Sequence, residues 1–495
     1  MWDSLISQMN LLENKPFVIG KREQYTYGDL RRYCSYFNSL YIEKTCRRVL
    51  LSVRQEFISY SAILAAYLTG STFCVINPEL PLERKRYMAE QFQPDLMICP
   101  ARDELAKIQE YAVLSVEEAK EEAARYEDGK IQKAYEENIA YILFTSGTTG
   151  LPKGCKIKRK GFEVFCTWAS GEFGFSESDR NGQYVPLYFD MSLVDIFGGV
   201  MHGVTLVPFP TMTEKLRPGV VVKEYEITFL NVVPQFLELL ERTNQFTNEY
   251  LRTLRMIRFG GDKIHRKRIE HLFSEVPNLK VVSTYGPTET TCFCFYRVVT
   301  KEDYKEHTTD IVSIGNTIPG WHAYLADMED GVGEIVIYGQ YIGEGYLNDV
   351  GEKKFQKERI NDVLEETYHT GDYAKIENGE YYFEGRKDAQ IKINGNRISL
   401  NEVEFAMLKT GVREAAAVFV QENIFCFYAE EEQPDKEISE NERKLMLQDM
   451  LPRYAVPSLC LKMKALPINP NGKVDRKQLR ECAEHILEER GKQNE

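Results

Sequence analysis

Short apolar runs alternate along the first part of the chain with longer stretches whose apolar residues recur at helical spacing. Short runs bounded by turn residues predict buried strands, and the longer stretches predict amphipathic helices. Strands that alternate with helices build parallel sheets, so the pattern predicts an α/β fold. The predicted helices are 26–40, 56–68 and 235–243, and the predicted strands are 48–53, 72–76, 96–99, 204–208, 229–233, 254–259 and 280–283.

The pattern changes twice. The charged segment 115–138 predicts a solvated helix and a linker that leads into the strand beginning near Tyr141. Beyond residue 388 an α+β pattern predicts a small C-terminal domain, 388–495, after a large N-terminal domain, 1–387. Its predicted helices are 401–408 and 442–450, and its predicted strands are 415–420 and 425–429, followed by an acidic loop.

Composition excludes several classes of protein. The net charge of -13 argues against nucleic acid as a partner, because phosphate backbones attract clustered Lys and Arg. The longest apolar run, 60–76, is broken at Thr69-Gly70-Ser71 and is too short for the ~18 residues of a membrane span. The N-terminus has no positive region before an apolar run, so no secretory signal is predicted and the expected location is cytoplasmic.

The cysteines predict no metal site. Eleven cysteines, an odd number without CxxC pairs, indicate free thiols rather than disulfides or zinc ligands. Cys292 and Cys294 alternate in a predicted strand, where they are expected to be buried small residues.

The segment Tyr141–Gly154, YILFTSGTTGLPKG, joins an apolar strand to a loop that is suited to polyphosphate. Glycines let backbone N–H groups turn toward an anion, hydroxyls add donors and a lysine adds charge. The spacing excludes a Walker A loop, and a Gly/Thr surface hairpin is the alternative. The candidate ATP-binding residues here are Thr145, Ser146, Gly147, Thr148, Thr149, Gly150 and Lys153.

This loop resembles the phosphate loop of the adenylate-forming enzymes, which include acyl-CoA synthetases, luciferases, peptide-synthetase adenylation domains and D-alanine–carrier protein ligases. The resemblance implies parallel-rich sheets layered with helices in the large domain, and a small mobile C-terminal lid. It also implies ATP and Mg²⁺ as cofactors. Further motifs follow in the order of the family.

The motif STYGPTET matches the nucleotide site of the family. In STYGPTET, 283–290, the family places the aromatic at Tyr285 against adenine and uses the acid at Glu289 to hold Mg²⁺, which takes one or two carboxylates with phosphate oxygens and waters. Gly286 and Thr288 of this motif are counted with the nucleotide site. A Gly-Pro turn with a surface Glu is the alternative.

Four more positions are assigned to the nucleotide by resemblance. In FGGD, 259–262, Gly261 and Asp262 border adenine, and tight-turn geometry alone is the alternative explanation of the glycines. The resemblance assigns Asp372, in YHTGDY, to the ribose hydroxyls, and Arg386 to the nucleotide.

The resemblance also marks the machinery of the second domain. Lys473, in PINPNGKVDR, 467–476, corresponds to a lysine that bridges the substrate carboxylate and the α-phosphate. Asp388 matches the hinge about which the small domain swings between two half-reactions. Lys392 contributes in the second conformation.

The segment YFDMSLVD, 188–195, indicates the class of acyl substrate. In the amino-acid-activating branches of the family, the acid at Asp190 pairs with the substrate ammonium, whereas an acid on an amphipathic helix is the alternative. Gly260 stands where D-alanine ligases usually carry a cysteine, which enlarges the expected pocket. Arg258 either faces the pocket and suits an acidic or carboxamide side chain, or faces outward. The other expected wall residues are Met191, Asn231 and Thr284.

The predicted activity is ATP-dependent adenylation of a small amino acid, followed by transfer to the phosphopantetheine thiol of a separate carrier protein, as in D-alanine ligases. A freestanding peptide-synthetase-type adenylation enzyme for another amino acid is the alternative. Acyl-CoA synthetase is a third possibility that Asp190 disfavours, and a catalytically silent binding module is a fourth.

Overall fold

The computed structural model describes residues 1–21, 24–145, 151–348, 354–386, 390–393, 396–430, 438–468 and 474–493. The chain divides into two compact units. The larger unit comprises Met1–Pro78, Ala89–Phe144 and Gly154–Gly385, and the smaller unit comprises Glu79–Met88, Thr145–Lys153 and Arg386–Glu495. A division after residue 385 lies beside the expected boundary, but two short segments from the first third of the chain also belong to the smaller unit.

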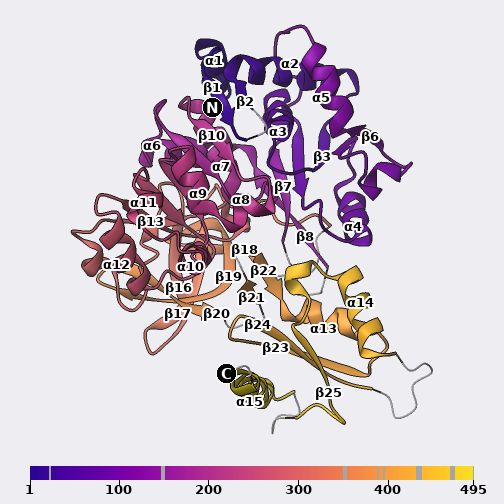
Figure 1. Ribbon diagram of the computed structural model, residues 1–495, viewed down its shortest axis with the longest axis vertical. Coiled ribbons are helices and arrows are strands. Elements are labelled where there is room, and N and C mark those ends of the chain that lie inside the picture. The colour runs from indigo at the N-terminus through magenta and orange to yellow at the C-terminus, as the bar shows by residue number, and fades with distance from the viewer. Residues whose placement is uncertain are drawn as a thin grey trace. The chain divides into compact units, whose positions relative to one another are not determined.

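One sheet of the larger unit has the strand order β6-β5-β3-β4-β7-β8, and its pairs from β6 to β7 are parallel, as predicted (Figure 1). Its strands are β3 (Arg48–Ser52), β4 (Thr72–Ile76), β5 (Leu96–Cys99), β6 (Ala112–Ser115), β7 (Ile139–Thr145) and β8 (Lys153–Lys158). The helices of this part of the chain are α2 (Tyr27–Glu43), α3 (Phe57–Thr69), α4 (Leu82–Phe92) and α5 (Val116–Arg125). The predicted helix in 115–138 therefore ends at Arg125, and no regular element follows before β7.

The long apolar run 60–76 is a buried helix and a buried strand. Every residue of α3 is buried, which explains why this helix is apolar on all sides. Gly70 ends α3 with φ +92°, and a Cβ there would lie 1.9 Å from the carbonyl oxygen of Tyr135, so only glycine fits. Among the described residues, no helix is both long and apolar enough to cross a membrane.

The second sheet of the larger unit has the order β15-β14-β13-β12-β11-β9-β10-β1-β2. It is parallel from β1 to β13, with antiparallel strands at both edges. The strands are β1 (Pro16–Ile19), β2 (Gln24–Thr26), β9 (Arg180–Gln183), β10 (Thr205–Pro208), β11 (Phe229–Val232), β12 (Met256–Phe259), β13 (Lys280–Tyr285), β14 (Phe295–Val299) and β15 (Asn316–Thr317). The helices are α1 (Trp2–Leu11), α6 (Arg159–Glu172), α7 (Met191–Met201), α8 (Met212–Leu216), α9 (Pro218–Glu224), α10 (Gln235–Arg242), α11 (Asn248–Leu251) and α12 (Arg266–Glu275).

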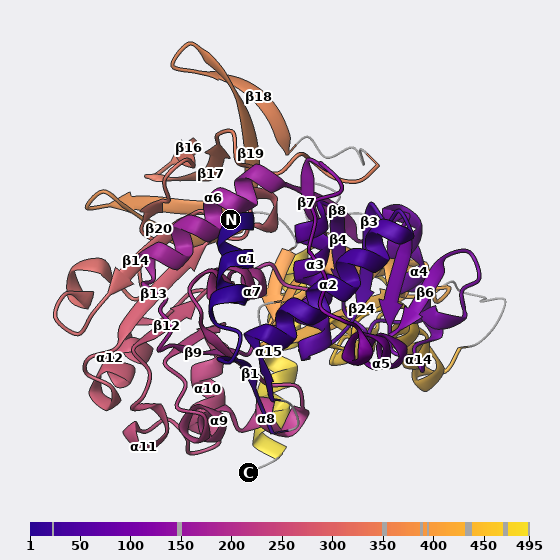
Figure 2. The same ribbon diagram turned by 90° about the horizontal axis from the view of Figure 1, so that it is seen from above.

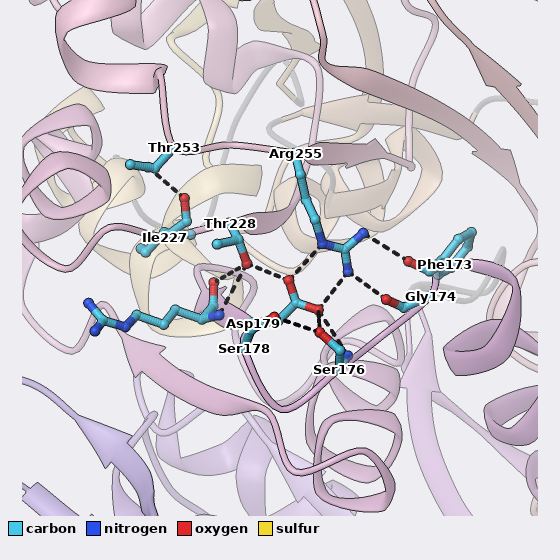
Figure 3. A network of polar contacts seen from close by, with 10 residues as sticks. Phe173, Gly174, Ser176, Ser178, Asp179, Ile227, Thr228, Thr253 and Arg255 are labelled. Atoms are coloured by element: carbon cyan, nitrogen blue, oxygen red, sulfur yellow. Dashed lines mark hydrogen bonds and ion pairs between the residues drawn. The ribbon is translucent and has the colours of Figure 1, made fainter.

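A polar network ties together the amino ends of three parallel strands (Figure 3). Asp179, just before β9, accepts hydrogen bonds from Arg255 Nε at 2.6 Å, Arg255 Nη2 at 2.7 Å and Thr228 Oγ1 at 2.7 Å. Burial acts to raise the pKa of Asp179, but the hydrogen bonds from Arg255 and Thr228 outweigh it and hold the pKa below its usual value. Because Thr228 precedes β11 and Arg255 precedes β12, the network fixes the edge of the sheet from which these strands begin.

An antiparallel sheet completes the larger unit, with the order β16-β17-β19-β18 and β20 beside β19. Its strands are β16 (His322–Glu329), β17 (Val332–Tyr338), β18 (Phe355–Ile360), β19 (Val363–Glu377) and β20 (Glu380–Arg386). Figure 2 shows the β18–β19 hairpin extending away from the other strands of this sheet. Its tip carries two exposed apolar side chains, Val363 and Leu364.

The smaller unit has the predicted α+β character. Its strands are β21 (Gln390–Ile393), β22 (Asn396–Ser399), β23 (Glu414–Val420), β24 (Asn423–Ala429) and β25 (Leu459–Lys462), and its helices are α13 (Leu400–Leu408), α14 (Glu440–Met450) and α15 (Arg476–Gln493). α13 packs on β23 and β24, and α15 packs on β23. The predicted fold class, a large α/β domain with a small α+β domain, is confirmed.

Candidate active site

The candidate substrate residues of the larger unit gather beyond the carboxyl ends of the parallel strands. The FGGD turn follows β12, and Tyr285 ends β13. Asp190 follows β9 and stands at the start of α7. Open α/β sheets bind ligands at this edge, the one opposite the Asp179 network.

Asp190 is a buried carboxylate without full compensation. The residue is 8% exposed, and its Oδ2 atom has no hydrogen-bond partner within the described chain. Burial raises the pKa of Asp190, and Glu289 acts in the same direction, while hydrogen bonds from Thr288 and from the Met191 backbone oppose the shift. Leaving a carboxylate oxygen buried and unpaired is costly, so this atom is suited to a cationic ligand.

Arg258 is fully buried in β12, which answers the question of whether it faces inward or outward. Its Nε donates to Asn231 Oδ1 at 3.1 Å, and its Nη2 donates to the Met191 carbonyl at 3.2 Å. The guanidinium lies over the ring of Phe293 at 4.8 Å from the centroid. The expected wall residues Met191, Asn231 and Arg258 are therefore in direct contact with one another.

The space beside Gly260 is already filled. A Cβ on Gly260 would lie 2.8 Å from Met191 Cε, 3.1 Å from Met191 Sδ and 2.9 Å from Thr284 Oγ1. Thr284 itself is buried and donates to the Phe259 carbonyl at 2.8 Å. The Met191 thioether therefore lies where a side chain at position 260 would begin, and the expectation that Gly260 enlarges the pocket stays a prediction.

The nucleotide candidates of β13 and β19 are joined by a short hydrogen bond. Tyr285 Oη donates to Asp372 Oδ2 at 2.6 Å, and both side chains are buried. Burial raises the pKa of Tyr285 well above its usual value, and Asp372 adds to the shift. The next residue, Gly286, tolerates no side chain, because a Cβ would lie 2.4 Å from the Phe293 Cα.

The FGGD turn has the close backbone geometry that its glycines predict. Gly261 has φ +89°, in the region that favours glycine. The Asp262 carboxylate accepts from Gln235 Nε2 at 2.9 Å and from the backbone N–H of Lys263 at 2.8 Å. The Asp262 side chain therefore braces this turn against α10.

Glu289 is suited to a hard cation. It lies in the short 3₁₀ helix Thr288–Thr290, is 1% exposed, and accepts from Tyr346 Oη at 2.7 Å. Among the described residues no cluster of three metal-ligating side chains occurs. Mg²⁺ takes one or two carboxylates and fills its other positions with phosphate oxygens and water.

The candidates in the smaller unit are described only in part. Thr145 ends β7, Lys153 begins β8 with a buried side chain, and Arg386 ends β20. Only the backbone of Lys392 is described. The other expected residues lie outside the described residues: they are Ser146, Gly147, Thr148, Thr149, Gly150, Asp388 and Lys473.

Sequence reasoning missed two partners of the site. Asp195, on α7, is fully buried and accepts from Asn181 Nδ2 at 3.2 Å and Asn231 Nδ2 at 3.3 Å. An acid within the apolar string LVDIF, 193–197, was the available signal. Tyr346, which donates a hydrogen bond to Glu289, stands in a stretch without any motif, so the sequence carries no signal for it.

Cys292 and Cys294 are buried, as expected, but they are not in a strand. β14 begins only at Phe295, and Cys292 has φ +72°. Burial raises the pKa of Cys292 well above its usual value, with a contribution from Asp190, so the thiol stays protonated.

Known proteins resemble this chain over nearly its whole length. Bacitracin synthase 3 of Bacillus licheniformis is 29% identical over 493 residues, which is 95% of this chain but 8% of that protein. The chain thus spans under a tenth of that relative. D-alanine–D-alanyl carrier protein ligase of Listeria monocytogenes serotype 4a is 26% identical over 484 residues, covering 92% of this chain and 93% of the ligase.

Solved structures share the fold. The adenylation domain AlmE of Vibrio cholerae, in complex with glycyl-adenosine-5'-phosphate, superposes with a TM-score of 0.85 at 22% identity, covering 98% of this chain and 97% of that one. The family model of AMP-binding enzymes matches residues 7–347, which is more than half of the sequence. The chain therefore belongs to the AMP-binding family of adenylate-forming enzymes, as its phosphate loop predicted.

Proposed function

We propose that this protein activates an amino acid by joining its carboxylate to AMP, with release of pyrophosphate from ATP. The observation that carries the proposal is Asp190, a buried carboxylate at the carboxyl edge of the sheet with one oxygen that finds no partner among the described residues. An α-ammonium is the complementary group, because it brings both the missing charge and the missing hydrogen-bond donors. The activity of an adenylate-forming ligase follows from the family, and the amino acid follows from Asp190.

The same carboxylate would discriminate against acids that lack an ammonium. A fatty or aryl acid bound here would leave Asp190 desolvated and unpaired, which costs far more than the loss of a methylene contact. This argument favours an amino acid over the substrate of an acyl-CoA synthetase.

The chain's own residues position the reactants. A carboxylate is already ionised at neutral pH and needs no general base, so catalysis consists of alignment and charge neutralisation. Tyr285 and Asp372, held together at 2.6 Å, offer an aromatic face and a buried acid for the nucleoside. Glu289 would hold Mg²⁺, which when bound neutralises phosphate charge.

A loop and a lysine, both described only in part or not at all, complete the proposal. The loop 145–153 would cradle the phosphates, and Lys473 would bridge the carboxylate and the α-phosphate during adenylation. Loss of one such preorganised cationic contact is typically worth on the order of 10² to 10³ in rate.

The second half-reaction would transfer the aminoacyl group to the phosphopantetheine thiol of a carrier protein. The relatives named D-alanine–D-alanyl carrier protein ligase support this step, because they match this chain along nearly their whole length. A peptide-synthetase-type adenylation enzyme for another amino acid is the second candidate. The 29% identity with a segment of bacitracin synthase 3 favours it to a similar degree.

The test is ATP–pyrophosphate exchange with the purified protein and Mg²⁺, across both enantiomers of the proteinogenic amino acids, glycine, β-alanine and a fatty acid. We expect exchange to depend on an amino acid and to be independent of coenzyme A. A preference for D-alanine would favour the carrier-ligase candidate, and a preference for another amino acid would favour the peptide-synthetase candidate. Exchange with the fatty acid alone would overturn the proposal.

A further inference from the structure

Arg258 is the one described arginine that is buried in the same cluster as Asp190, and its contacts show what it does there. Its guanidinium is enclosed between aromatic rings, with centroids at 4.8 Å for Phe293 and 5.6 Å for Phe173. Burying a guanidinium is expensive unless a counter-charge and hydrogen bonds compensate it. The question is whether the protein or the substrate supplies that counter-charge.

The protein supplies it through Asp195. Asn231 bridges the two charged groups, accepting from Arg258 Nε at 3.1 Å and donating to Asp195 Oδ2 at 3.3 Å. Burial lowers the pKa of Arg258, and the negative charge of Asp195 opposes this shift. Burial raises the pKa of Asp195 to about 6, and the positive charge of Arg258 opposes that shift. The pair therefore carries opposite charges at neutral pH and has no net charge.

Arg258 and Asn231 converge on one backbone atom. Asn231 Nδ2 donates to the Met191 carbonyl at 2.7 Å, and Arg258 Nη2 donates to the same oxygen at 3.2 Å. Met191 is the first residue of α7 and directly follows Asp190. Its thioether lies beside Gly260, while its carbonyl, directly after Asp190, is held by these two hydrogen bonds.

The net charge of Asp190, Asp195 and Arg258 is balanced by a single bound cation. Asp190, Asp195 and Arg258 together carry one net negative charge, which the ammonium of an amino acid balances. An acidic side chain would add a second buried negative charge. Arg258 would not balance it, because Asp195 already neutralises its charge, although its Nη1 atom has no hydrogen-bond partner among the described residues. A neutral side chain adds no such cost.

We infer that Arg258 is a positioning residue: neutralised by Asp195, it holds the Met191 carbonyl and thereby the Asp190 carboxylate, and the protein selects amino acids with uncharged side chains. The inference rests on the proposed function and deepens it. It replaces the simpler interpretation of an inward Arg258 as the partner of an acidic substrate.

The test is a double-mutant cycle on the amino acid KM, measured by pyrophosphate exchange in the full chain. We expect Arg258→Met and Asp195→Asn each to raise the amino acid KM by on the order of 10²-fold, with the KM for ATP unchanged, because each leaves a buried charge unpaired. The double variant should recover to within about 10-fold of wild type, since it removes both charges together. Arg258→Lys keeps the charge but loses the forked geometry, and it should give an intermediate rise in KM with kcat kept.

The matched control is Arg255→Met, three residues earlier in the chain. Arg255 is also paired with a buried aspartate, but at the opposite edge of the sheet (Figure 3). The Arg255→Met variant should have a lower melting temperature than the wild type but the same KM for the amino acid. Equal effects of Arg255→Met and Arg258→Met on that KM would show a purely structural role and overturn the inference.

Two other outcomes bear on the inference alone. Additive losses in the double variant would show that Asp195 does not neutralise Arg258. A wild-type preference for aspartate or glutamate that Arg258→Met abolishes would show direct recognition of an acidic side chain. Either result would overturn the inference while leaving amino acid activation intact, whereas exchange with no amino acid at all would overturn both.

Discussion

At the scale of single residues, the site is built around a carboxylate that the fold leaves incompletely satisfied. Asp190 is held by Thr288 and by the backbone of Met191, yet its Oδ2 finds no partner among the described residues. An orphaned buried acid lowers stability, so its presence calls for a ligand that compensates it. The ammonium of an amino acid supplies both the charge and the hydrogen-bond donors that this oxygen lacks.

Asp190→Asn should raise the KM for the amino acid by on the order of 10²-fold or more, because it removes the charge from a buried ion pair. The KM for ATP should stay within about 2-fold, a tolerance equivalent to roughly 0.4 kcal/mol. Both constants come from pyrophosphate exchange at varied concentrations of each substrate. An unchanged amino acid KM would remove Asp190 from substrate recognition.

The amino acid KM should also depend on pH. Burial raises the pKa of Asp190, and binding of an ammonium requires its ionised form. The KM should therefore be constant at neutral pH and rise as pH falls through the raised pKa, above the ~3.9 of an ordinary aspartate. The KM for ATP, measured in the same buffers, serves as the control; an amino acid KM that stays flat down to pH 4 would contradict the assignment.

Sequence predicted some of these residues and not their contacts. Asp190 was found because it stands in a recognisable string, FDMS, at the end of an apolar segment. The direction of Arg258 was left open, because its burial depends on Asp195 and Asn231, which come from other elements. The Met191 thioether beside Gly260 could not be predicted for the same reason, since the two residues are distant in sequence.

At the scale of elements, strands were predicted well where they are buried on both faces. β4 and β5 are uniformly buried, and their apolar runs gave their bounds. The sheet of β16 to β20 was not predicted, because its strands are partly exposed and mix charged with apolar residues, as in FQKERI of β18. Such strands form through pairing with neighbours, which periodicity alone does not reveal.

The turn between β13 and β14 should be intolerant of any side chain. In Gly286→Ala, the Cβ would meet backbone atoms of Phe293, Cys294 and Cys292 at 2.4 to 2.9 Å, and backbone cannot rotate away. We expect a loss of roughly 1–3 kcal/mol, seen as a lower melting temperature. Gly171→Ala in α6, which meets nothing within 4 Å, should be neutral or stabilising by up to ~1 kcal/mol. Equal melting temperatures for the two variants would contradict this packing.

At the scale of the whole molecule, the chain has two compact units, between which the proposed function would divide the residues of its two half-reactions. The residues that would recognise the amino acid belong to the larger unit, while the expected lysine and the expected hinge belong to the smaller one. A hinge needs only a few residues that absorb large changes in φ and ψ. The resemblance placed this hinge near the division that the structure makes after residue 385.

Two variants in the smaller unit should separate the half-reactions. Asp388→Pro fixes φ at the expected hinge, so it should spare pyrophosphate exchange and block loading of a carrier protein. Lys473→Ala should nearly abolish exchange, and with it carrier loading from ATP, while ATP binding persists. Carrier loading is followed by mass spectrometry of the phosphopantetheine arm. Normal loading by Asp388→Pro would refute a rotation about this residue.

The most direct test of amino acid activation compares acids that differ only in the ammonium. Pyrophosphate exchange should be measured with the preferred amino acid and with the same acid lacking its α-amino group, such as alanine beside propionate. The account predicts exchange with the amino acid and a kcat/KM at least about 10²-fold lower for its deamino counterpart, because Asp190 would be buried without a partner. Equal kcat/KM values for the two acids would contradict the central claim that Asp190 recognises the substrate.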